Sequence, residues 1–359
     1  MSDLHDAVEA SSLLEIGAAA DRRLRRLLEC ETQRWCQVDP ELAQPLGELL
    51  AFVTNGGKRL RPAFCHWGFV AAGGDPNASA VVDVGAALEL LHGFALIHDD
   101  VMDGSAVRRN RPTVHMNYVG QHNKGGWNGE ARRFGEGVAI LLGDLAFVYA
   151  DVLMSGAPAA ALAVFNELRI ELMFGQYLDL HGAVTRSYDE RTARRVALFK
   201  SAKYTVERPL HLGAALAGRL DELAAPFSDY GLRLGEAFQL RDDVLGAFGD
   251  AATIGKPVGD DFREGKPTPL VASAMRRACD RSDHAALRVL AQLGRADLNE
   301  TAIEQIRSVI EETGARAEIE ARICELTDQA CEMLSHAEIA PHAQTALRGL
   351  ASYVATRDR

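Results

Sequence analysis

The sequence lacks several features that mark exported or nucleic-acid-binding proteins. Its 6 cysteines are scattered through 359 residues, with no C-x-x-C pair among them. This spacing argues against a disulfide framework or a zinc site and indicates reduced thiols. A net charge of −11 argues against a nucleic-acid partner, because such proteins present a basic face. Residues 1–17 carry acids where an export signal needs bases, so we expect a cytoplasmic protein.

Long uncharged apolar runs are also lacking. The most apolar segment, residues 138–165, is interrupted by Asp144, Asp151 and Pro158. The two aspartates are two helical turns apart, which places them on about the same helix face. A helix that crossed a bilayer would tolerate such charges poorly. We therefore expect a buried helix of a soluble bundle here, and no integral membrane segment.

Helical periodicity is present almost everywhere. Apolar side chains recur at spacings of three and four in residues 81–100, and residues 302–334 alternate apolar stripes with Glu/Arg faces. No period-two alternation is long enough to build a sheet, and no linker rich in Pro, Gly or Ser divides the chain. We therefore predict an all-α fold, a single helical bundle over 1–359 with an N-terminal helical segment (1–40) and C-terminal helices (270–359).

Two glycine-rich polar stretches break the helical pattern, at residues 119–137 and 249–269. Both are long for connections within a helical bundle. Long loops in compact domains are often lids or ligand-binding loops, so we expect these two stretches to form such loops.

Acidic residues gather at the ends of two apolar helical runs. The first run ends in LIHDDVMD (96–103) and the second in QLRDDVLG (239–246). Asp99 and Asp103 are one helical turn apart and share a face, and Gln239, Asp242 and Asp243 are likewise three and four apart on one face. One Asp-Asp pair would fit the surface end of a helix, but two matched copies indicate a pocket lined by carboxylates. Such oxygen ligands suit Mg²⁺, which prefers a few carboxylates together with water and phosphate oxygens.

Basic residues accompany the acids. The stretch NGGKRLRP (55–62) offers a lysine and two arginines after a Gly-Gly turn, where the backbone can approach a ligand closely. His92 lies two helical turns before Asp99 on the same face, and it fits a core histidine and a site residue equally well. Metal on the acids and direct contacts from the bases would together neutralise a phosphate-bearing ligand.

Three motifs, in the same order along the chain, resemble those of the trans-type polyprenyl diphosphate synthases: GGKRLRP, LIHDDVMDGSAVRRNRPTVH and FQLRDDVLGAFGD…GKPVGDDFREGKPT. The resemblance is greatest to bacterial geranylgeranyl diphosphate synthases and runs from about residue 50 to residue 270. It implies an all-α bundle around a deep apolar cavity, a homodimer, and magnesium as cofactor. The implied reaction joins isopentenyl diphosphate head to tail to an allylic diphosphate.

The resemblance also implies roles for individual residues. Asp99 and Asp103, assisted by Asp100, would hold magnesium on the allylic diphosphate, and Asp242, assisted by Asp243, would hold a further ion. These acids and Lys200 form the implied catalytic set. The residues implied for isopentenyl diphosphate are Lys58, Arg61, His92 and Arg109. Those implied for the allylic diphosphate are Arg108, Lys200, Ser201, Gln239, Lys256 and Lys266.

Two features bear on the metal site and the product. Gly246 stands where many relatives carry a third aspartate, so the second metal site would rest on fewer carboxylates. Phe94 is the fifth residue before Asp99 and is followed by Ala95. In the family this arrangement resembles synthases of twenty-carbon geranylgeranyl diphosphate, and farnesyl diphosphate is the second choice of product.

Three other interpretations stay open. A class I terpene cyclase also uses an acidic helix and magnesium, but it would need neither GGKRLRP nor His92. An HD-type phosphohydrolase could use the His-Asp pair at 98–100, which leaves the second Asp-Asp helix without a role. A regulatory subunit of a prenyl synthase dimer would be expected to lose the acids that this chain retains.

Overall fold

The computed structural model describes residues 2–185, 189–249, 259–295 and 297–357, with side chains from residue 12 onward. The chain is helical through most of these ranges, so the predicted all-α fold class is confirmed. The helices divide into two compact units, Met1–Leu162 with Pro209–Leu220, and Ala163–Arg208 with Asp221–Arg359. Each unit is described separately below, and the single domain expected from the sequence stays a prediction.

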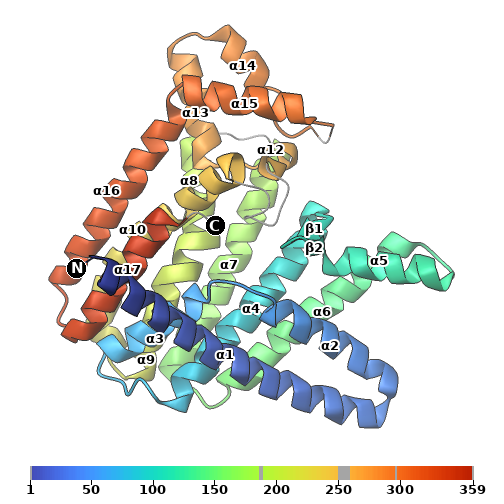
Figure 1. Ribbon diagram of the computed structural model, residues 1–359, viewed down its shortest axis with the longest axis vertical. Helices are drawn as coiled ribbons and strands as arrows, with labels where there is room; N and C mark the ends of the chain where they lie inside the picture. Colours follow the sequence, from blue (N-terminus) through green and yellow to red (C-terminus); the bar gives the residue numbers. More distant parts are fainter. Residues whose placement is uncertain (1, 186–188, 250–258, 296, 358–359) are drawn as a thin grey trace. The chain divides into compact units, whose positions relative to one another are not determined.

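The first unit is built around helix α4. It contains α1 (Ser2–Val38), the 3₁₀ turn η1 (Pro40–Leu42), α2 (Ala43–Thr54), α3 (Leu60–Ala71), α4 (Ser79–Asp103), α5 (Val114–Gly125), α6 (Ala131–Met154) and most of α9 (Arg208–Leu216). Helix α4 packs against α1, α3 and α6 (Figure 1). Its burial exceeds the predicted stripe, because Leu90 is fully buried as well as Leu88 and Leu91, which share the spacing of three.

Helix α4 ends directly after the first acidic motif. Gly104 adopts a left-handed conformation (φ 66°), and the N–H groups of Gly104 and Ser105 donate to the carbonyls of Val101 and Asp100. The chain then forms an antiparallel hairpin of β1 (Val107–Arg108) and β2 (Arg111–Pro112). Its turn residues, Arg109 and Asn110, have positive φ angles of 51° and 58°, as a type I′ turn requires. This hairpin was not predicted, because two-residue strands are too short to show alternation.

The prediction of a long loop at 119–137 was wrong. Helix α5 continues to Gly125 and α6 begins at Ala131, so only a short turn joins them. Gly126 ends α5 in a left-handed conformation (φ 60°), and the Trp127 ring packs edge-on against Phe134. In the second glycine-rich stretch, residues 250–258 lie outside the described residues, and the remainder contains α12 (Asp260–Glu264).

The second unit contains the remaining helices. They are α7 (Ala159–Thr185, from residue 163 on), α8 (Glu190–Ala197), the π-helix η2 (Leu198–Glu207), α10 (Leu220–Phe248, from residue 221 on), α12, α13 (Pro269–Asp280), α14 (His284–Leu290), α15 (Glu300–Glu312), α16 (Ala315–Ser335) and α17 (Pro341–Thr356). Its core joins α10 to α13, α14, α15 and α16 through buried aliphatic side chains such as Leu240, Leu270, Ile306 and Ile323. This core therefore fixes the half of α10 that carries the second acidic motif.

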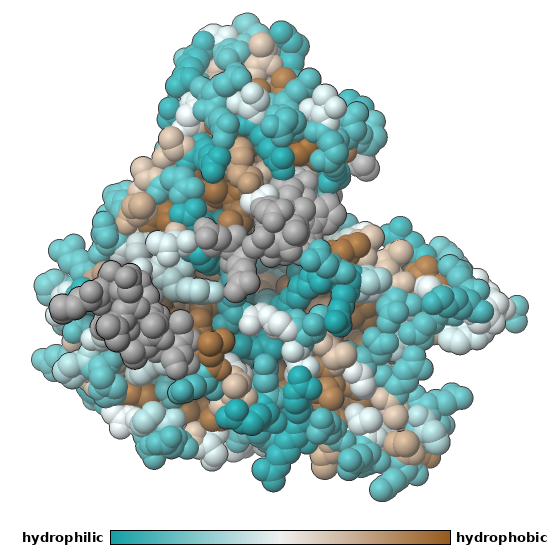
Figure 2. Space-filling view, viewed as in Figure 1, coloured by the Kyte–Doolittle hydropathy of each residue, from teal (hydrophilic) through white to brown (hydrophobic). Residues whose placement is uncertain are grey.

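Two of the described helices, α4 and α6, are long and apolar enough to cross a membrane by length and composition. The apolar window of α4 is 67% buried and that of α6 is 44% buried. Segment 138–165 is not one helix, because α6 ends at Met154 and α7 begins at Ala159. Helix α6 is also less buried than predicted, since Leu141, Val148 and Val152 are exposed. The face of the molecule in Figure 2 is mainly hydrophilic, with apolar residues in smaller patches.

Candidate functional site

The first acidic motif holds an arginine in place. Asp100 is 1% exposed and accepts two hydrogen bonds from Arg108 Nε, at 2.8 and 2.9 Å. Arg108 Nη2 also lies 3.4 Å from an oxygen of Asp99. A buried carboxylate is stable only with such a partner, so Asp100 fixes the position of Arg108 at the C-terminal end of α4. Asp99 and Asp103, one turn apart, keep partly exposed side chains that a ligand can reach.

A basic cluster lies beside this motif in the first unit. Arg109 Nη1 donates to the carbonyl oxygens of Asn55 (2.7 Å) and Gly56 (3.3 Å), which binds the hairpin turn to the loop that carries Lys58. Burial holds the pKa of His92 well below its usual range, and the charges of Arg61 and Arg109 lower this pKa further. The structure therefore brings Arg61, His92 and Arg109 together, with the imidazole neutral. The surplus positive charge favours an anionic ligand.

Arg59, between Lys58 and Arg61, has a structural role and is not available to a ligand. Its side chain is buried and lies 2.6 Å from Glu89 and 2.7 Å from Asp21. Arg59 Nη2 also donates to the carbonyl oxygen of Val53, at 2.8 Å. These contacts anchor the loop to α1, α2 and α4. Lys58 and Arg61, whose side chains are partly exposed, remain the site candidates of this motif.

In the second unit, the π-helix η2 presents Lys200 and Ser201. Lys200 Nζ lies 2.5 Å from Asp179, a buried carboxylate on α7. The η2 backbone comes so close to α7 that a Cβ on Gly175 would lie 2.6 Å from Lys200 N. The Ser201 hydroxyl donates to the side-chain oxygen of Gln239 on α10. π-Helical turns are rare and are often found at functional sites.

The second acidic motif continues this network. Gln239 Nε2 donates to Asp243 Oδ1 at 2.7 Å, so hydrogen bonds connect Ser201, Gln239 and Asp243. Burial raises the pKa of Asp243 well above its usual range, and the charges of Asp261, Asp242 and Asp179 raise it further. Asp243 Oδ2 is buried without a hydrogen-bond partner among the described residues.

These acids fit a divalent metal. A buried carboxylate oxygen without a donor is costly, and a cation beside it would remove that cost. Within the described ranges, no group of three or more His, Cys, Asp or Glu side chains forms a ready-made cage. Magnesium needs no such cage, because it retains waters and binds phosphate oxygens.

Asp261 lies beside the position where many relatives carry a third aspartate. A Cβ on Gly246 would lie 2.8 Å from Asp261 Oδ2. Lys266 Nζ lies 2.6 Å from Glu264 and 3.9 Å from Asp261, which places this predicted residue near the end of α10. Lys256, also predicted, lies outside the described residues.

Sequence reasoning missed Asp179, Asp261 and Arg357. Asp179 and Asp261 could have been sought as acids near predicted site residues, since Lys200 needs a counter-ion and Asp261 stands five residues before Lys266. Arg357 contacts Asp242, and nothing in the local sequence indicates this pair because the two residues are far apart in the chain.

Introducing an aspartate at Gly246 should destabilise the protein. The new side chain would meet Asp261 Oδ2 and add a like charge there, so we expect Gly246→Asp to lower the free energy of unfolding by about 1–2 kcal/mol. Gly137, inside α6, has open space at its Cβ, and Gly137→Ala should stabilise by up to about 1 kcal/mol. Urea titration measures both changes. A stabilising Gly246→Asp substitution would contradict the crowding by Asp261.

Phe94 and Ala95 are consecutive residues of α4, before the first acidic motif. Phe94 is almost fully buried, and its ring centroid is 5.0 Å from that of Phe147 on α6 and 4.6 Å from that of His98. Ala95 is only partly buried. The aromatic pair Phe94–Phe147 thus lies about 7–8 Å before Asp99 along α4, at 1.5 Å of rise per residue.

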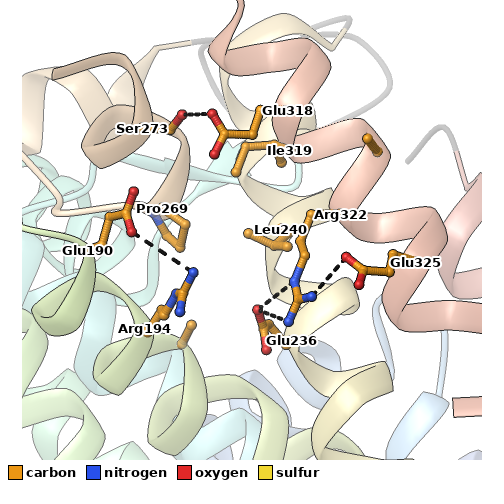
Figure 3. A pocket seen from close by; sticks show the side chains of 12 residues that line it. Glu190, Arg194, Glu236, Leu240, Pro269, Ser273, Glu318, Ile319, Arg322 and Glu325 are labelled. Carbon is orange, nitrogen blue, oxygen red and sulfur yellow. Dashed lines mark hydrogen bonds and ion pairs between the residues drawn. The ribbon is translucent and has the colours of Figure 1, made fainter. Parts of the chain in front are cut away.

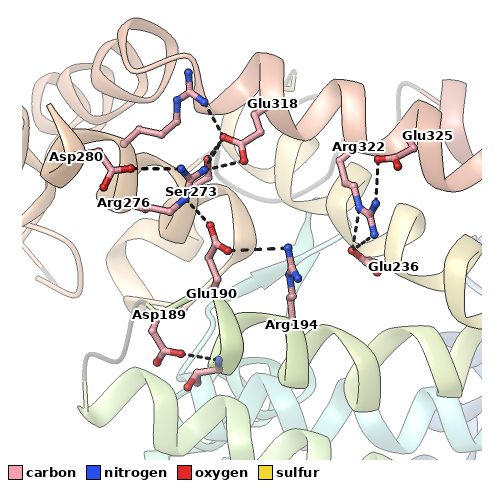
Figure 4. Close-up of polar contacts among 12 residues, drawn as sticks. Asp189, Glu190, Arg194, Glu236, Ser273, Arg276, Asp280, Glu318, Arg322 and Glu325 are labelled. Carbon is pink, nitrogen blue, oxygen red and sulfur yellow. Dashed lines mark hydrogen bonds and ion pairs between the residues drawn. The ribbon is translucent and has the colours of Figure 1, made fainter.

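A cavity of about 530 Å³ lies in the second unit, and one of its lining residues, Leu240, directly follows the predicted site residue Gln239. Apolar side chains such as Leu240, Pro269 and Ile319 line it together with charged ones. Arg322 is bound between Glu236 and Glu325, and Glu190 faces Arg194 (Figure 3). Glu318 accepts hydrogen bonds from Ser273 and Arg276 (Figure 4). It also accepts one from Arg277. The lining has an excess of acids, four glutamates against two arginines, and Arg276 and Arg277, which pair with Glu318, offset it.

Comparisons with known proteins agree with the sequence motifs. The polyprenyl synthetase family model matches residues 39–310. A short chain isoprenyl diphosphate synthase of Methanothermobacter thermautotrophicus is 31% identical, over 94% of this chain and 95% of the relative. Octaprenyl diphosphate synthase of Escherichia coli is 31% identical, over 89% of this chain and 92% of the relative. Geranylgeranyl pyrophosphate synthase of Corynebacterium glutamicum, solved with isoprenyl diphosphate and magnesium, is 38% identical with a TM-score of 0.90, over 96% of this chain and 99% of that one.

Proposed function

The chain belongs to the polyprenyl synthetase family, and on this premise we propose that it makes geranylgeranyl diphosphate from isopentenyl diphosphate and allylic diphosphates. Family membership makes it a trans-prenyltransferase. The twenty-carbon product is the finer part of the proposal, because the relatives differ in the length of their products. It is supported by the single ring at Phe94 and by the similarity to the Corynebacterium glutamicum enzyme.

Magnesium is the cofactor of the proposed reaction, in keeping with the ion in that related structure. Its ligands would be Asp99, Asp103 and Asp242, with Asp100 and Asp243 in support. When bound, magnesium supplies positive charge that stabilises the diphosphate as it leaves the allylic carbon.

Two groups of basic and polar residues bind the two substrates. Isopentenyl diphosphate binds to the first group, which is Lys58, Arg61, His92 and Arg109. The allylic diphosphate binds to the second group, which is Arg108, Lys200, Ser201, Gln239, Lys256 and Lys266. The observation that supports this proposal most directly is the gathering of Arg61 and Arg109 around a neutral His92, beside the acidic end of α4.

The reaction breaks the carbon–oxygen bond of the allylic diphosphate and forms a bond from its carbon to the double bond of isopentenyl diphosphate. Lys200 and Arg108 stabilise the negative charge that develops on the leaving diphosphate. The released diphosphate accepts the proton that is lost, so no protein base is assigned. The apolar side chains of α4 exclude water from the carbocation.

A homodimer is the expected assembly. Helix α7 exposes the apolar residues Ile170, Phe174, Tyr177 and Val184, which recur at helical spacing along one stripe. An exposed apolar stripe of this length is typical of a protein–protein interface, and a second copy would bury it. A cytoplasmic location follows from the sequence expectation and stays a proposal.

Phe94→Ala should lengthen the main product and Ala95→Phe should shorten it. The first change removes a ring from the wall below Asp99, and the second adds one a turn from it. Chromatography of the dephosphorylated products measures the shift, which we expect to be at least one five-carbon unit in each case.

Phe69→Ala is the matched control, because Phe69 on α3 has the same exposed fraction as Phe94, 8%. It should lower stability without changing product length. Unchanged products from both α4 variants would contradict the proposal that Phe94 and Ala95 line the cavity and limit product length.

Farnesyl diphosphate is the second candidate product, favoured by Phe147, whose ring adds a second aromatic beside Phe94.

A further inference from the structure

Arg357, the residue that follows α17, reaches the second acidic motif. Its Nη2 donates to Asp242 Oδ1 at 2.5 Å and to the carbonyl oxygen of Phe238 at 3.0 Å. The guanidinium carbon lies 4.1 Å from the centroid of the Phe238 ring. The Arg357 side chain is 3% exposed, and its Nε is buried without a hydrogen-bond partner among the described residues.

These contacts hold Arg357 in place whether or not Asp242 binds anything else. Phe238 and Asp242 are one turn apart on α10, so the guanidinium lies along one face of that helix. The ring and the carbonyl oxygen of Phe238 stabilise the charge independently of the carboxylate. A buried guanidinium is costly to leave unpaired, so it cannot simply swing away when a cation approaches.

The same contacts determine how the Asp242 carboxylate is oriented. Arg357 occupies Oδ1, while the Asp242 side chain as a whole is 42% exposed. An aspartate rotates readily about its side-chain bonds when nothing holds it. Here one oxygen is held, which leaves Oδ2 for a ligand.

We propose that Arg357 is a positioning residue for magnesium, because it fixes the Asp242 carboxylate with Oδ2 directed to the ion. This inference depends on the proposed function, in which Asp242 is a metal ligand. Groups that orient a metal ligand in this way typically contribute a factor of about 10–100 to metal affinity. The opposite effect is the alternative, in which the arginine charge competes with the metal and weakens its binding.

Titration with Mn²⁺ in the presence of inorganic diphosphate shows whether Arg357 strengthens metal binding, as proposed, or weakens it. Electron paramagnetic resonance of free Mn²⁺ gives the affinity without any turnover. Arg357→Met retains an apolar side chain on Phe238, and we expect it to weaken Mn²⁺ binding at one class of site by about 10–100-fold. Arg357→Lys retains the charge but not the planar fork, and it should show a smaller loss in the same direction.

Arg322→Met is the matched control. Arg322 also pairs with an acid of α10, Glu236, but that acid is not in the metal motif (Figure 3). Its substitution should leave Mn²⁺ affinity unchanged. Unchanged or tighter Mn²⁺ binding by both Arg357 variants overturns the proposal. If Arg357→Met fails to fold, Arg357→Lys alone decides, because weaker Mn²⁺ binding supports the proposal and unchanged or tighter binding overturns it.

Asp242→Asn separates this inference from the proposed function. If Asp242→Asn weakens Mn²⁺ binding and the Arg357 variants do not, only the part assigned to Arg357 fails. If Asp242→Asn has no effect, the assignment of Asp242 as a ligand fails, and the positioning proposal is overturned with it.

Discussion

Replacement of Asp99 or Asp103 by alanine is expected to reduce kcat by about 10³-fold or more while the helical content stays near that of the unchanged protein. Each substitution removes a proposed metal ligand, and with it charge that stabilises the leaving diphosphate. The loss of fold stability should be small, because the main partner of Arg108 is Asp100, which both variants retain. Product formation and circular dichroism measure the two effects separately.

Asp83→Ala is the matched control for these variants. Asp83 lies on the same helix and also pairs with an arginine, Arg23, at 2.5 Å. Its removal should leave kcat within a factor of about two, since pairs of this exposure contribute little. Near-normal turnover by either the Asp99 or the Asp103 variant would contradict the assignment of that residue as a metal ligand.

Arg59→Met is expected to lower the free energy of unfolding by about 3–5 kcal/mol, because it leaves Glu89 as a buried charge without its partner. Asp21 and the carbonyl oxygen of Val53 lose the same partner. A urea titration measures the change. The effect distinguishes Arg59 from its neighbours, since Lys58→Ala and Arg61→Ala should act on substrate binding.

Two further variants test the reason for this loss. Arg23→Met breaks a partly exposed pair and should cost less than about 1 kcal/mol. The double variant Arg59→Met/Glu89→Leu removes both buried charges and should recover most of the stability. If Arg59→Met is no less stable than Arg23→Met, the buried pair is not the anchor of the loop.

The all-α fold and helix α4 could be predicted from the sequence because their determinants are local. Apolar residues at spacings of three and four indicate a helix over α4, and Gly104 ends that helix directly after the motif. The grouping of Lys58, Arg61, His92 and Arg109 was implied by the family resemblance and not by any local signal, and its role in binding isopentenyl diphosphate stays a prediction.

Other features could not be predicted because they depend on contacts between distant segments. The π-helix η2 has no sequence signature, although it carries Lys200 and Ser201. The glycines at 119–137 indicated a loop, but Gly126 ends α5 beside Trp127, and Gly120, Gly135 and Gly137 lie inside α5 and α6. The structural role of Arg59 and the pairing of Arg357 with Asp242 could likewise be recognised only in the folded chain.

The most direct test of the proposed function is a product analysis of the unchanged protein. Purified protein is incubated with isopentenyl diphosphate, magnesium and, in turn, dimethylallyl, geranyl or farnesyl diphosphate, and the dephosphorylated products are separated by chromatography. We expect geranylgeraniol as the main product from each allylic substrate, and no product when isopentenyl diphosphate or magnesium is omitted. A cyclised product, or release of diphosphate from the allylic substrate alone without chain elongation, would contradict the proposed prenyl diphosphate synthase.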